Sequence, residues 1–433
     1  MMDDNNRWDK DFPEQWERVP LKSKFTFGKG LSIKKTDLTE QGENVISYGQ
    51  IHAKWNSNVH CHNELLRHVP QTFCNGSDSS IAKRNGFIFA DTSEDLDGVG
   101  NCAFIDSDKT IYAGYHTVLL TPIEDHDNKY LAYLFTTDTW RYQIRRHLTE
   151  VKVFSISQKT LKQTYIVLPP SDIQHAIASL LDRKCAAIDD SIAKHKAIIE
   201  KLEEYRKAEI TRAVTKGLNP DAKMKDSGIP WVGEIPEGWE VCPLWTAFYN
   251  RKNKNTEGLE KNLLSLSYGR IIEKDIETKD GLLPANFNGY NIIEDGDIVL
   301  RMTDLQNDHK SLRTGLCTEH GIITSAYITL APKETVDSRY FHYLLHSYDI
   351  EKVFYAMGEG IRQGMNYNEM KCMNIIVPTL SEQKEIADSL DSLSNSVTEG
   401  IDKHNQLIAK LEEYKKSLIY NAVTGKIDCR EGA

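Results

Sequence analysis

Apolar residues recur at alternating steps of three and four over two long stretches of the chain, residues 169–217 and 378–425. This spacing is typical of a helix that packs one apolar stripe against a second helix. Pro169 and Pro378 begin the two stretches, just before the periodic residues, and Gly217 and Gly425 follow the last of these residues. Both are signals for helix ends. The pattern predicts two long helices, each roughly 65 Å long at ~1.5 Å per residue. The capping candidates are Ser171 or Asp172 for the first helix and Thr379 or Ser381 for the second.

The two stretches are copies of one sequence. They align without a gap over 48 positions at a shift of 209 residues, and 20 of these positions are identical. Two equal helices in one chain can pair with each other, so we expect one helix pair with a shared seam. The predicted seam positions are Leu181, Ile188, Ile192, His195, Ile199 and Leu202 in the first helix, and Leu390, Val397, Ile401, His404, Ile408 and Leu411 in the second.

The repeat continues outside the helices. FPEQWERVPL at 12–21 matches IPEGWEVCPL at 235–244, and Ser47-Tyr48-Gly49 matches Ser267-Tyr268-Gly269. The shift between copies falls from 223 to 209 before the helices and stays constant within them, so the length variation lies in the regions before each helix. The sequence therefore predicts two variable domains that alternate with two helices of fixed length.

Short strand-like runs separated by Gly, Asn and Asp turns predict mixed α/β variable domains. Examples of these runs are Phe87 to Ala90 and Ile298 to Leu300. The predicted organisation is a first variable domain at 1–168, a helix at 169–217, a linker at 218–234, a second variable domain at 235–377, a helix at 378–425 and a tail at 426–433.

Composition narrows the class of protein. The chain has 433 residues and a net charge of −10, and no apolar run approaches the length of a membrane span. The polar start MMDDNNRWDKD does not resemble a signal peptide, and the eight scattered cysteines are typical of reduced thiols. We therefore expect a cytoplasmic protein. The acidic excess is concentrated at 91–127, and basic residues cluster elsewhere.

The repeated motifs form a specific set. They are the matching segments 12–21 and 235–244, which we call the WE boxes after their shared Trp-Glu, KLEEY followed by AVT in both helices, and SGIPWVGEIPEGWEV between the halves. Together they resemble the specificity subunit of type I restriction–modification enzymes of bacteria and archaea. GDIVLRMTDLQNDHKSLRTG in the second variable domain resembles a recognition segment of that family. The resemblance implies two α/β target-recognition domains joined by two conserved helices that pair as an antiparallel coiled coil with an internal pseudo-two-fold.

The resemblance also implies partners and cofactors. Each domain would read one half of a split target on double-stranded DNA, and the helices would set the half-site spacing. The subunit would not be catalytic. It would assemble with two modification subunits that use S-adenosylmethionine, and with restriction subunits that use ATP and Mg²⁺. The acidic segment 91–127 departs from what a DNA-facing surface requires.

The residues agree with a non-catalytic role. The sequence contains no GxxxxGK[ST] phosphate loop and no [DN]PP[YFW] tetrapeptide of adenine methyltransferases. His60-Cys61-His62 lacks a second ligand pair at zinc spacing, so we expect no metal site there. Two other functions stay open: a coiled-coil assembly protein that binds no DNA, and a self-sufficient DNA-modifying enzyme.

Candidate DNA contacts are basic, amide or hydroxyl side chains near the repeated motifs and glycine-flanked loops. They are Tyr48, Gln50, Lys83, Arg84, Arg141, Arg145, Arg146, Arg251, Lys252, Tyr268, Arg270, Arg301, Thr303, Lys310, Arg313, Arg362 and Gln363. Two alternatives stay open for these residues. Tyr48 and Tyr268 are equally consistent with packed core tyrosines, and the arginine stripe at 141–146 with a solvated helix face.

Two like domains that read opposite ends of a DNA site should be related by a two-fold axis perpendicular to the duplex. That symmetry predicts antiparallel helices. His195 and His404 then fall near the two midpoints and should approach each other, with no more than one of them charged.

Overall fold

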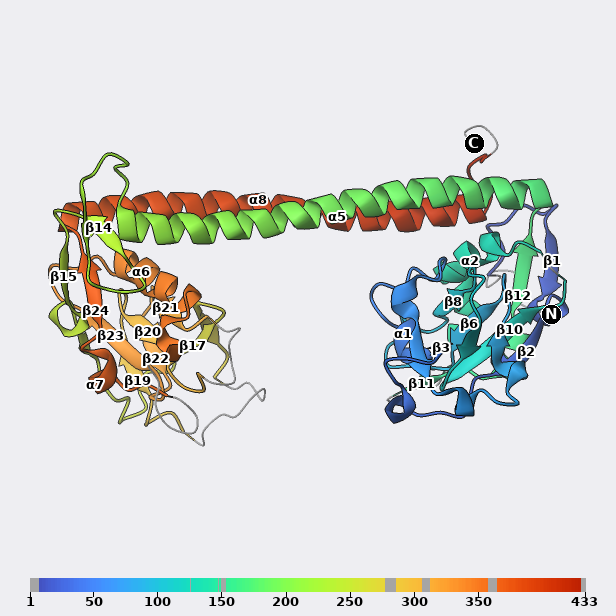
Figure 1. The fold of residues 1–433 in the computed structure, drawn as a ribbon, viewed down its shortest axis with the longest axis horizontal. Coiled ribbons are helices and arrows are strands. Elements are labelled where there is room, and N and C mark those ends of the chain that lie inside the picture. Colours follow the sequence, from blue (N-terminus) through green and yellow to red (C-terminus); the bar gives the residue numbers. More distant parts are fainter. Residues whose placement is uncertain are drawn as a thin grey trace. The chain divides into compact units, whose positions relative to one another are not determined.

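The computed structural model divides the chain into two compact units, each of which is described by itself. The first unit contains residues 1–194 and 406–433, and the second contains 195–405. Figure 1 shows the elements of both. The residues described are 8–124, 126–146, 148, 153–276, 286–305, 312–356 and 364–429. None of the helices in these ranges is long and apolar enough to span a membrane.

Two long helices, α5 (Ser171–Lys216) and α8 (Leu380–Val423), occupy the two periodic stretches. Thr379 caps α8, because its hydroxyl accepts from the backbone N–H of Glu382 at 3.3 Å and its own N–H donates to the Glu382 carboxylate at 3.2 Å. Gly217 and Gly425 follow the helices with φ of 76° and 69°, the left-handed conformation that favours glycine at a helix end.

The helices lie side by side within each unit. All twelve seam positions are buried or half-buried. In the first unit, Lys415 Nζ of α8 contacts Asp189 Oδ1 of α5 at 2.7 Å. In the second unit, His195 lies against His404, at 2.8 Å between their Nδ1 atoms. Since higher numbers in α8 face lower numbers in α5, the two helices run antiparallel.

In the described part of the first domain, the strands form two four-stranded sheets and two small pairs. The first sheet, in the order β2-β10-β6-β8, is antiparallel throughout, and the second, in the order β4-β3-β9-β5, contains the parallel pair β3 and β9. The strands are β1 (Glu17–Pro20), β2 (Phe25–Lys29), β3 (Glu43–Ile46), β4 (Arg67–Val69), β5 (Ile81–Ala82), β6 (Phe87–Ala90), β7 (Thr92–Ser93), β8 (Cys102–Phe104), β9 (Ile111–Ala113), β10 (Thr117–Pro122), β11 (Phe154–Ser155) and β12 (Tyr165–Leu168).

The second domain repeats this plan. Its sheets have the orders β16-β23-β20-β21 and β18-β17-β22-β19, and again the second sheet contains one parallel pair, β17 with β22. The strands are β13 (Met224–Asp226), β14 (Glu234–Pro236), β15 (Glu240–Pro243), β16 (Phe248–Asn250), β17 (Leu263–Ser267), β18 (Arg270–Lys274), β19 (Asn291–Ile293), β20 (Ile298–Leu300), β21 (Thr314–Leu316), β22 (Gly321–Ile323), β23 (Ile328–Pro332) and β24 (Asn374–Val377).

Shorter helices cover the sheets. The α-helices are α1 (Tyr48–Ile51), α2 (Lys129–Thr136), α3 (Asp138–Arg145), α4 (Gln158–Lys162), α6 (Ser338–Ile350) and α7 (Tyr367–Met370). The 3-10 helices are η2 (Leu21–Ser23), η3 (Lys35–Asp37), η4 (Asn63–Leu65), η5 (Gln71–Phe73), η6 (Asp78–Ser80), η7 (Leu244–Thr246) and η8 (Val353–Ala356).

Each domain core includes parts of both long helices. In the first unit, Tyr130 of α2 is buried, and its hydroxyl donates to the carbonyls of Val167 and Val423, both at 3.1 Å. In the second unit, Tyr340 of α6 donates in the same way to Val214 at 3.1 Å and Ile376 at 3.3 Å. Each domain is therefore joined to the end of the helix that belongs to the other half of the sequence.

The WE boxes complete this docking. A Cβ placed on Gly425 would lie 2.9 Å from the Trp16 ring, and one on Gly217 would lie 3.3 Å from the Trp239 ring. The glycines thus let each tryptophan close over a helix end.

The segment expected to be a linker, 218–234, is more ordered than its composition indicates. β13 pairs with β14 as a hairpin, and Ile229, Val232 and Ile235 are buried in the second core. The glycines in this stretch make turns, and the apolar residues between them anchor it.

Candidate nucleic-acid interface

The repeated Ser-Tyr-Gly motif takes two different conformations. Tyr48 starts α1 and is half-buried, with its ring packed edge-on against Tyr115 at 5.5 Å. The amide oxygen of Gln50 accepts from the backbone N–H of Ser47 at 3.1 Å, so this side chain caps the short helix. Tyr268 instead lies in the turn between β17 and β18 and is 86% exposed, next to exposed Arg270. The interpretation as a packed tyrosine is therefore confirmed for Tyr48 and wrong for Tyr268.

The arginine stripe on α3 is mostly engaged inside the protein. Arg141 is buried, and its guanidinium donates to the carbonyls of Phe135 at 2.8 Å and Asp97 at 3.0 Å. The prediction that Arg141 contacts DNA is therefore wrong, because a buried guanidinium cannot reach a phosphate. Arg145 pairs with Asp138 at 2.7 Å, and Arg146 is exposed.

Arg313 requires the same correction. Its side chain is fully buried, and the guanidinium donates to the carbonyl of Thr303 at 2.6 Å and to that of Asp304 at 3.2 Å. It also donates to the carbonyl of Arg301 at 3.2 Å. Arg313 therefore positions the backbone that carries two other candidates, half-buried Arg301 and exposed Thr303.

The other candidates differ in exposure. Arg251 Nε lies 2.7 Å from the buried carboxylate of Asp297, whereas neighbouring Lys252 is exposed. Lys83 and Arg84 are exposed in the turn before β6, and Arg84 pairs with Asp108. Lys310, Arg362 and Gln363 lie outside the described residues.

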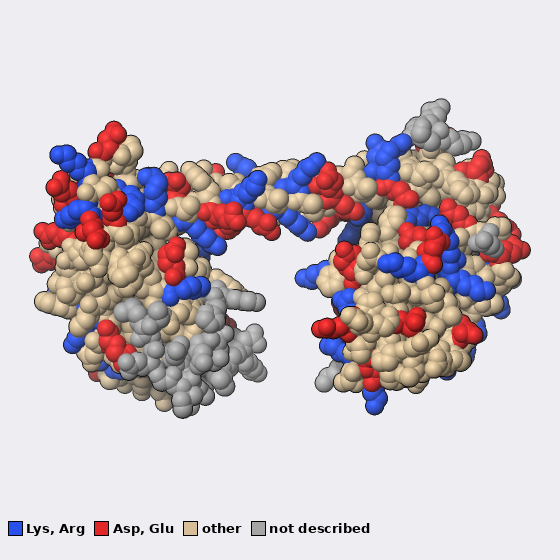
Figure 2. Space-filling model, viewed as in Figure 1, with Lys and Arg blue, Asp and Glu red and all other residues tan. Residues whose placement is uncertain are grey.

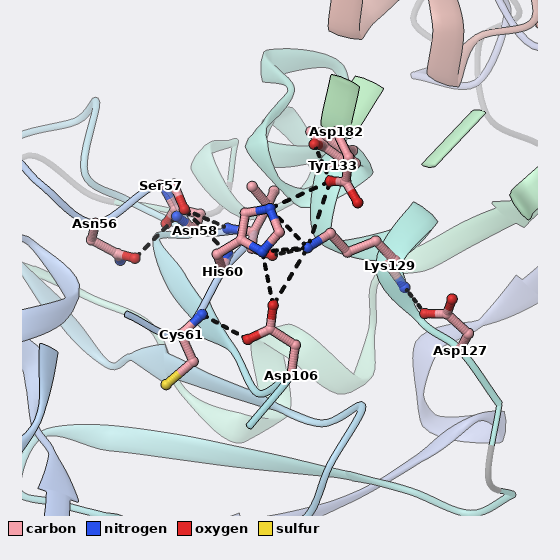
Figure 3. Close-up of polar contacts among 11 residues, drawn as sticks. Asn56, Ser57, Asn58, His60, Cys61, Asp106, Asp127, Lys129, Tyr133 and Asp182 are labelled. Atoms are coloured by element: carbon pink, nitrogen blue, oxygen red, sulfur yellow. Dashed lines mark hydrogen bonds and ion pairs between the residues drawn. The ribbon is translucent and has the colours of Figure 1, made fainter. Parts of the chain in front are cut away.

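A cluster of charged side chains joins the first domain to α5, and sequence reasoning missed it (Figure 3). His60 Nδ1 lies 2.8 Å from Asp106 Oδ2, and His60 Nε2 lies 3.5 Å from Asp182 Oδ1 of α5. Lys129 Nζ lies 3.6 Å from each of these carboxylates, and the Tyr133 hydroxyl donates to Asp182 at 2.6 Å. Two cations and two anions thus neutralise one another at the junction, which we call the first ionic junction.

The carboxylates set the protonation of this junction. Asp106 first and then Asp182 accept hydrogen bonds from the imidazole and raise the pKa of His60 to about 9. Burial and the charge of Lys129, whose Nζ lies 2.8 Å from His60 Nδ1, oppose this shift without cancelling it. Burial acts to raise the pKa of Asp106, but the hydrogen bonds from His60 and the Cys61 N–H lower it to about 2. His60 is therefore charged at neutral pH and engaged with carboxylates.

The second unit has a matching ionic junction. Arg339 Nη1 contacts Asp388 at 2.7 Å and Asp391 at 2.8 Å, and the Tyr343 hydroxyl donates to Asp391 at 2.8 Å. Tyr343 and Asp391 are the repeat partners of Tyr133 and Asp182. The recurrence of this Tyr–Asp pair was the signal in the sequence by which the junctions could have been found.

Comparison with known proteins decides the family. The family profile described as "Type I restriction modification DNA specificity domain" matches residues 13–204 and 313–413. The chain belongs to this specificity family. It is similar to a putative type I restriction enzyme MjaX specificity subunit of Methanocaldococcus jannaschii, with 26% identity over 72% of each chain. It is also similar to the EcoBI specificity subunit of Escherichia coli, with 23% identity over 66% of this chain and 63% of that one.

Solved structures share the fold of this specificity-family chain. The HsdS subunit from Thermoanaerobacter tengcongensis matches with a TM-score of 0.53 at 14% identity, covering 96% of this chain and 98% of that chain. A chain from a study of complex assembly and conformational transition of the type I R-M system matches with a TM-score of 0.70 at 14% identity, covering 96% and 99%.

The specificity-family helices bring His195 and His404 together in the second unit, as predicted. One Nδ1 must donate and the other accept across the 2.8 Å contact. Two charged imidazoles would leave no acceptor, so at most one of the rings carries a proton on both nitrogens in this arrangement.

Replacing Arg313 should destabilise the second domain, and replacing exposed Arg270 should have a much smaller effect. Arg313→Ala removes charge-assisted hydrogen bonds to buried carbonyls, and we expect a loss of about 2–4 kcal/mol in the free energy of unfolding. Arg270→Ala in the same domain is the matched control, with an expected loss below about 1 kcal/mol, because Arg270 is exposed. Urea unfolding measures both. Equal stability of the two variants would contradict the positioning role.

The first ionic junction should weaken as the pH rises. A histidine whose folded pKa is raised stabilises the fold fully below pH 6.5, and this contribution is lost as the pH rises from 6.5 through about 9. His60→Gln should abolish this pH dependence and cost roughly 1–2 kcal/mol at pH 6, allowing for the partial exposure of the ring.

Hydrogen exchange of peptides from the first unit, followed between pH 6 and 10 and corrected for intrinsic exchange, measures this effect. His62→Gln is the control, since the His62 ring lies 5.7 Å from the His60 ring but takes part in none of the ion pairs described for the junction. Parallel pH profiles for His60→Gln and the unsubstituted chain would refute the assignment.

Proposed function

We propose that this chain is the DNA specificity subunit of a type I restriction–modification complex. Each domain would read one half of a bipartite target on double-stranded DNA. The observation that carries the proposal is the repetition of one domain plan, with the same strand orders and the same tyrosine contacts to the helices. One chain with two equivalent but differently surfaced domains is suited to a target with two different halves.

In this proposal the chain supplies recognition and its partners supply the chemistry. S-adenosylmethionine would bind to the modification subunits, and ATP with Mg²⁺ to the restriction subunits. This chain would hold none of these groups. Within the described residues, no group of three or more His, Cys, Asp or Glu side chains is arranged to hold a metal ion.

The helices offer a duplicated surface for the modification subunits. In the second unit, Ile198 and Tyr205 of α5 are 40% and 51% exposed, one heptad apart. In the first unit, their repeat partners Leu407 and Tyr414 of α8 are 44% and 56% exposed. Figure 2 shows charged side chains of both signs along the helices in this view. Two copies of one apolar surface with a charged surround fit two copies of one partner.

The helix pair would also set the half-site spacing. Its two members have matching sequences of equal length, whereas the regions before them differ by 14 residues between the halves. Constant length in the helices, next to domains of variable length, supports a role in measuring distance.

Expression of the chain with its modification subunits should produce one methylated bipartite motif. Methylation-aware sequencing of the host DNA gives the motif directly, and the modification subunits alone are the control. Absence of any motif would support an assembly protein that reads no DNA. Methylation by this chain alone would support a self-sufficient enzyme.

An insertion in α5 should change the spacer. Four residues added between Lys201 and Tyr205 lengthen the helix by about 6 Å and rotate the remainder of α5 by about 40° beyond one turn. Since B-DNA rises ~3.4 Å per base pair, the spacer should grow by one or two base pairs with unchanged half-sites. Four residues inserted at Gly228, in the β13–β14 turn, are the control. An active α5 variant with the original spacer would refute the measuring role.

A further inference from the structure

The connection between two equivalent strands carries an exposed aromatic residue in both domains. In the second sheet of the first domain, β3 pairs antiparallel with β4 and parallel with β9. In the second domain, β17 pairs antiparallel with β18 and parallel with β22. The β3–β4 and β17–β18 connections are therefore at the same place in the fold, and they contain Trp55 and Tyr268 respectively.

Tyr268 occupies a position that its side chain disfavours. Ser267 pairs with Arg270, which leaves a two-residue turn with φ of 48° at Tyr268 and 79° at Gly269. A turn with two positive φ values prefers Asn-Gly, and a bulky residue in the left-handed region is strained by ~1–2 kcal/mol. The ring gains little in return from the protein, because the residue is 86% exposed.

Trp55 is exposed but firmly placed. The residue is 55% exposed, and its neighbour Asn56 donates through its side-chain amide to the carbonyls of Ile51 at 2.8 Å and Cys102 at 3.0 Å. The backbone N–H of Asn56 also donates to the carbonyl of Ala53 at 2.9 Å. These bonds tie the turn to β8, so the indole is presented to solvent by an anchored loop.

Each ring has an exposed cation close to it in sequence, Lys54 beside Trp55 and Arg270 two residues after Tyr268. A single exposed aromatic residue is ordinary on a protein surface. Two of them in equivalent connections, one on a strained turn and one on an anchored turn, each with a cation, are better explained by a shared ligand. Aromatic rings pack against bases and thymine methyl groups, and Lys or Arg pairs with phosphates or guanine.

We propose that Trp55 and Tyr268 contact the DNA bases, one in each half of the bipartite target. This proposal rests on the function proposed above and names a specificity-determining side chain for each domain. Lys54 and Arg270 would pair with DNA beside the rings. A two-stranded ribbon such as β17–β18 fits the major groove of B-DNA, which is about 12 Å wide.

The test uses the complex with its modification subunits and fluorescence anisotropy on labelled duplexes that carry both half-sites or one scrambled half-site. Trp55→Ala and Tyr268→Asn should each weaken binding to the full site by roughly five- to a hundredfold. The loss of affinity for each variant should vanish when the half-site that its ring contacts is scrambled, and should remain when the other half-site is scrambled. The half-site that abolishes the loss should differ between the two variants. Trp55→Phe and Tyr268→Phe should keep most of the affinity, since a ring remains.

Tyr268→Asn also separates binding from folding. Asparagine suits the positive φ of this turn, so we expect the second domain to become no less stable in urea unfolding. Trp245→Ala is the matched control for Trp55→Ala, because Trp245 is 50% exposed but lies in η7, which is not part of the second sheet of its domain. This control should bind as the unsubstituted complex does.

Three outcomes overturn the inference. Unchanged affinity of both variants in a complex that still prefers its target would exclude the aromatic contacts while leaving the proposed function intact. Losses that persist when either half-site is scrambled would exclude base contact by these rings. If the unsubstituted complex prefers no sequence at all, the proposed function itself fails, and this inference fails with it.

Discussion

The architecture depends on how each domain closes over the ends of two antiparallel helices. Where two helices run antiparallel, the start of one lies beside the end of the other. A domain attached to the start of its own helix must therefore also cover the last turn of its partner. Tyr130 and Tyr340 make this connection with buried hydroxyls that donate to Val423 and Val214, carbonyls that would otherwise be unsatisfied at a helix end. The same hydrogen bond is made in both units, so the two domains dock onto the helix ends in the same way.

The ionic junctions show that this docking is kept while its side chains change. His60 and Lys129 face Asp106 and Asp182 in the first unit, whereas one arginine, Arg339, faces several aspartates in the second. Both junctions retain the tyrosine that donates to the helix aspartate. Since a half-buried carboxylate requires a neighbouring cation but not a particular one, each junction keeps a cation beside the helix aspartate, and the residue that supplies it differs.

Much of this fold follows from local sequence, and much of the candidate interface does not. The heptad spacing and the end signals predicted both helices and the approach of His195 to His404, because periodicity and chain symmetry are visible in a sequence. The burial of a charged side chain is not visible in a sequence in this way. Arg313 and Arg141 read as free cations, yet the fold uses their guanidinium groups to satisfy buried carbonyls. The two Ser-Tyr-Gly copies also differ in a way that the motif alone does not predict. One begins a short helix and the other closes a hairpin, because neighbouring residues and packing determine the backbone conformation.

The divergence falls where the common plan constrains the chain least. Strand orders, the parallel pair and the helix contacts recur between the domains, but the connection after β3 spans a helix and turns, whereas the connection after β17 is two residues long. Connections at the surface tolerate such change because they hold few core contacts. A protein that reads two different half-sites needs different surfaces on the same scaffold. The strain at Tyr268 is located in one of these connections, where a folding requirement alone would favour asparagine, and the proposed contact with DNA would account for a residue that stability does not explain.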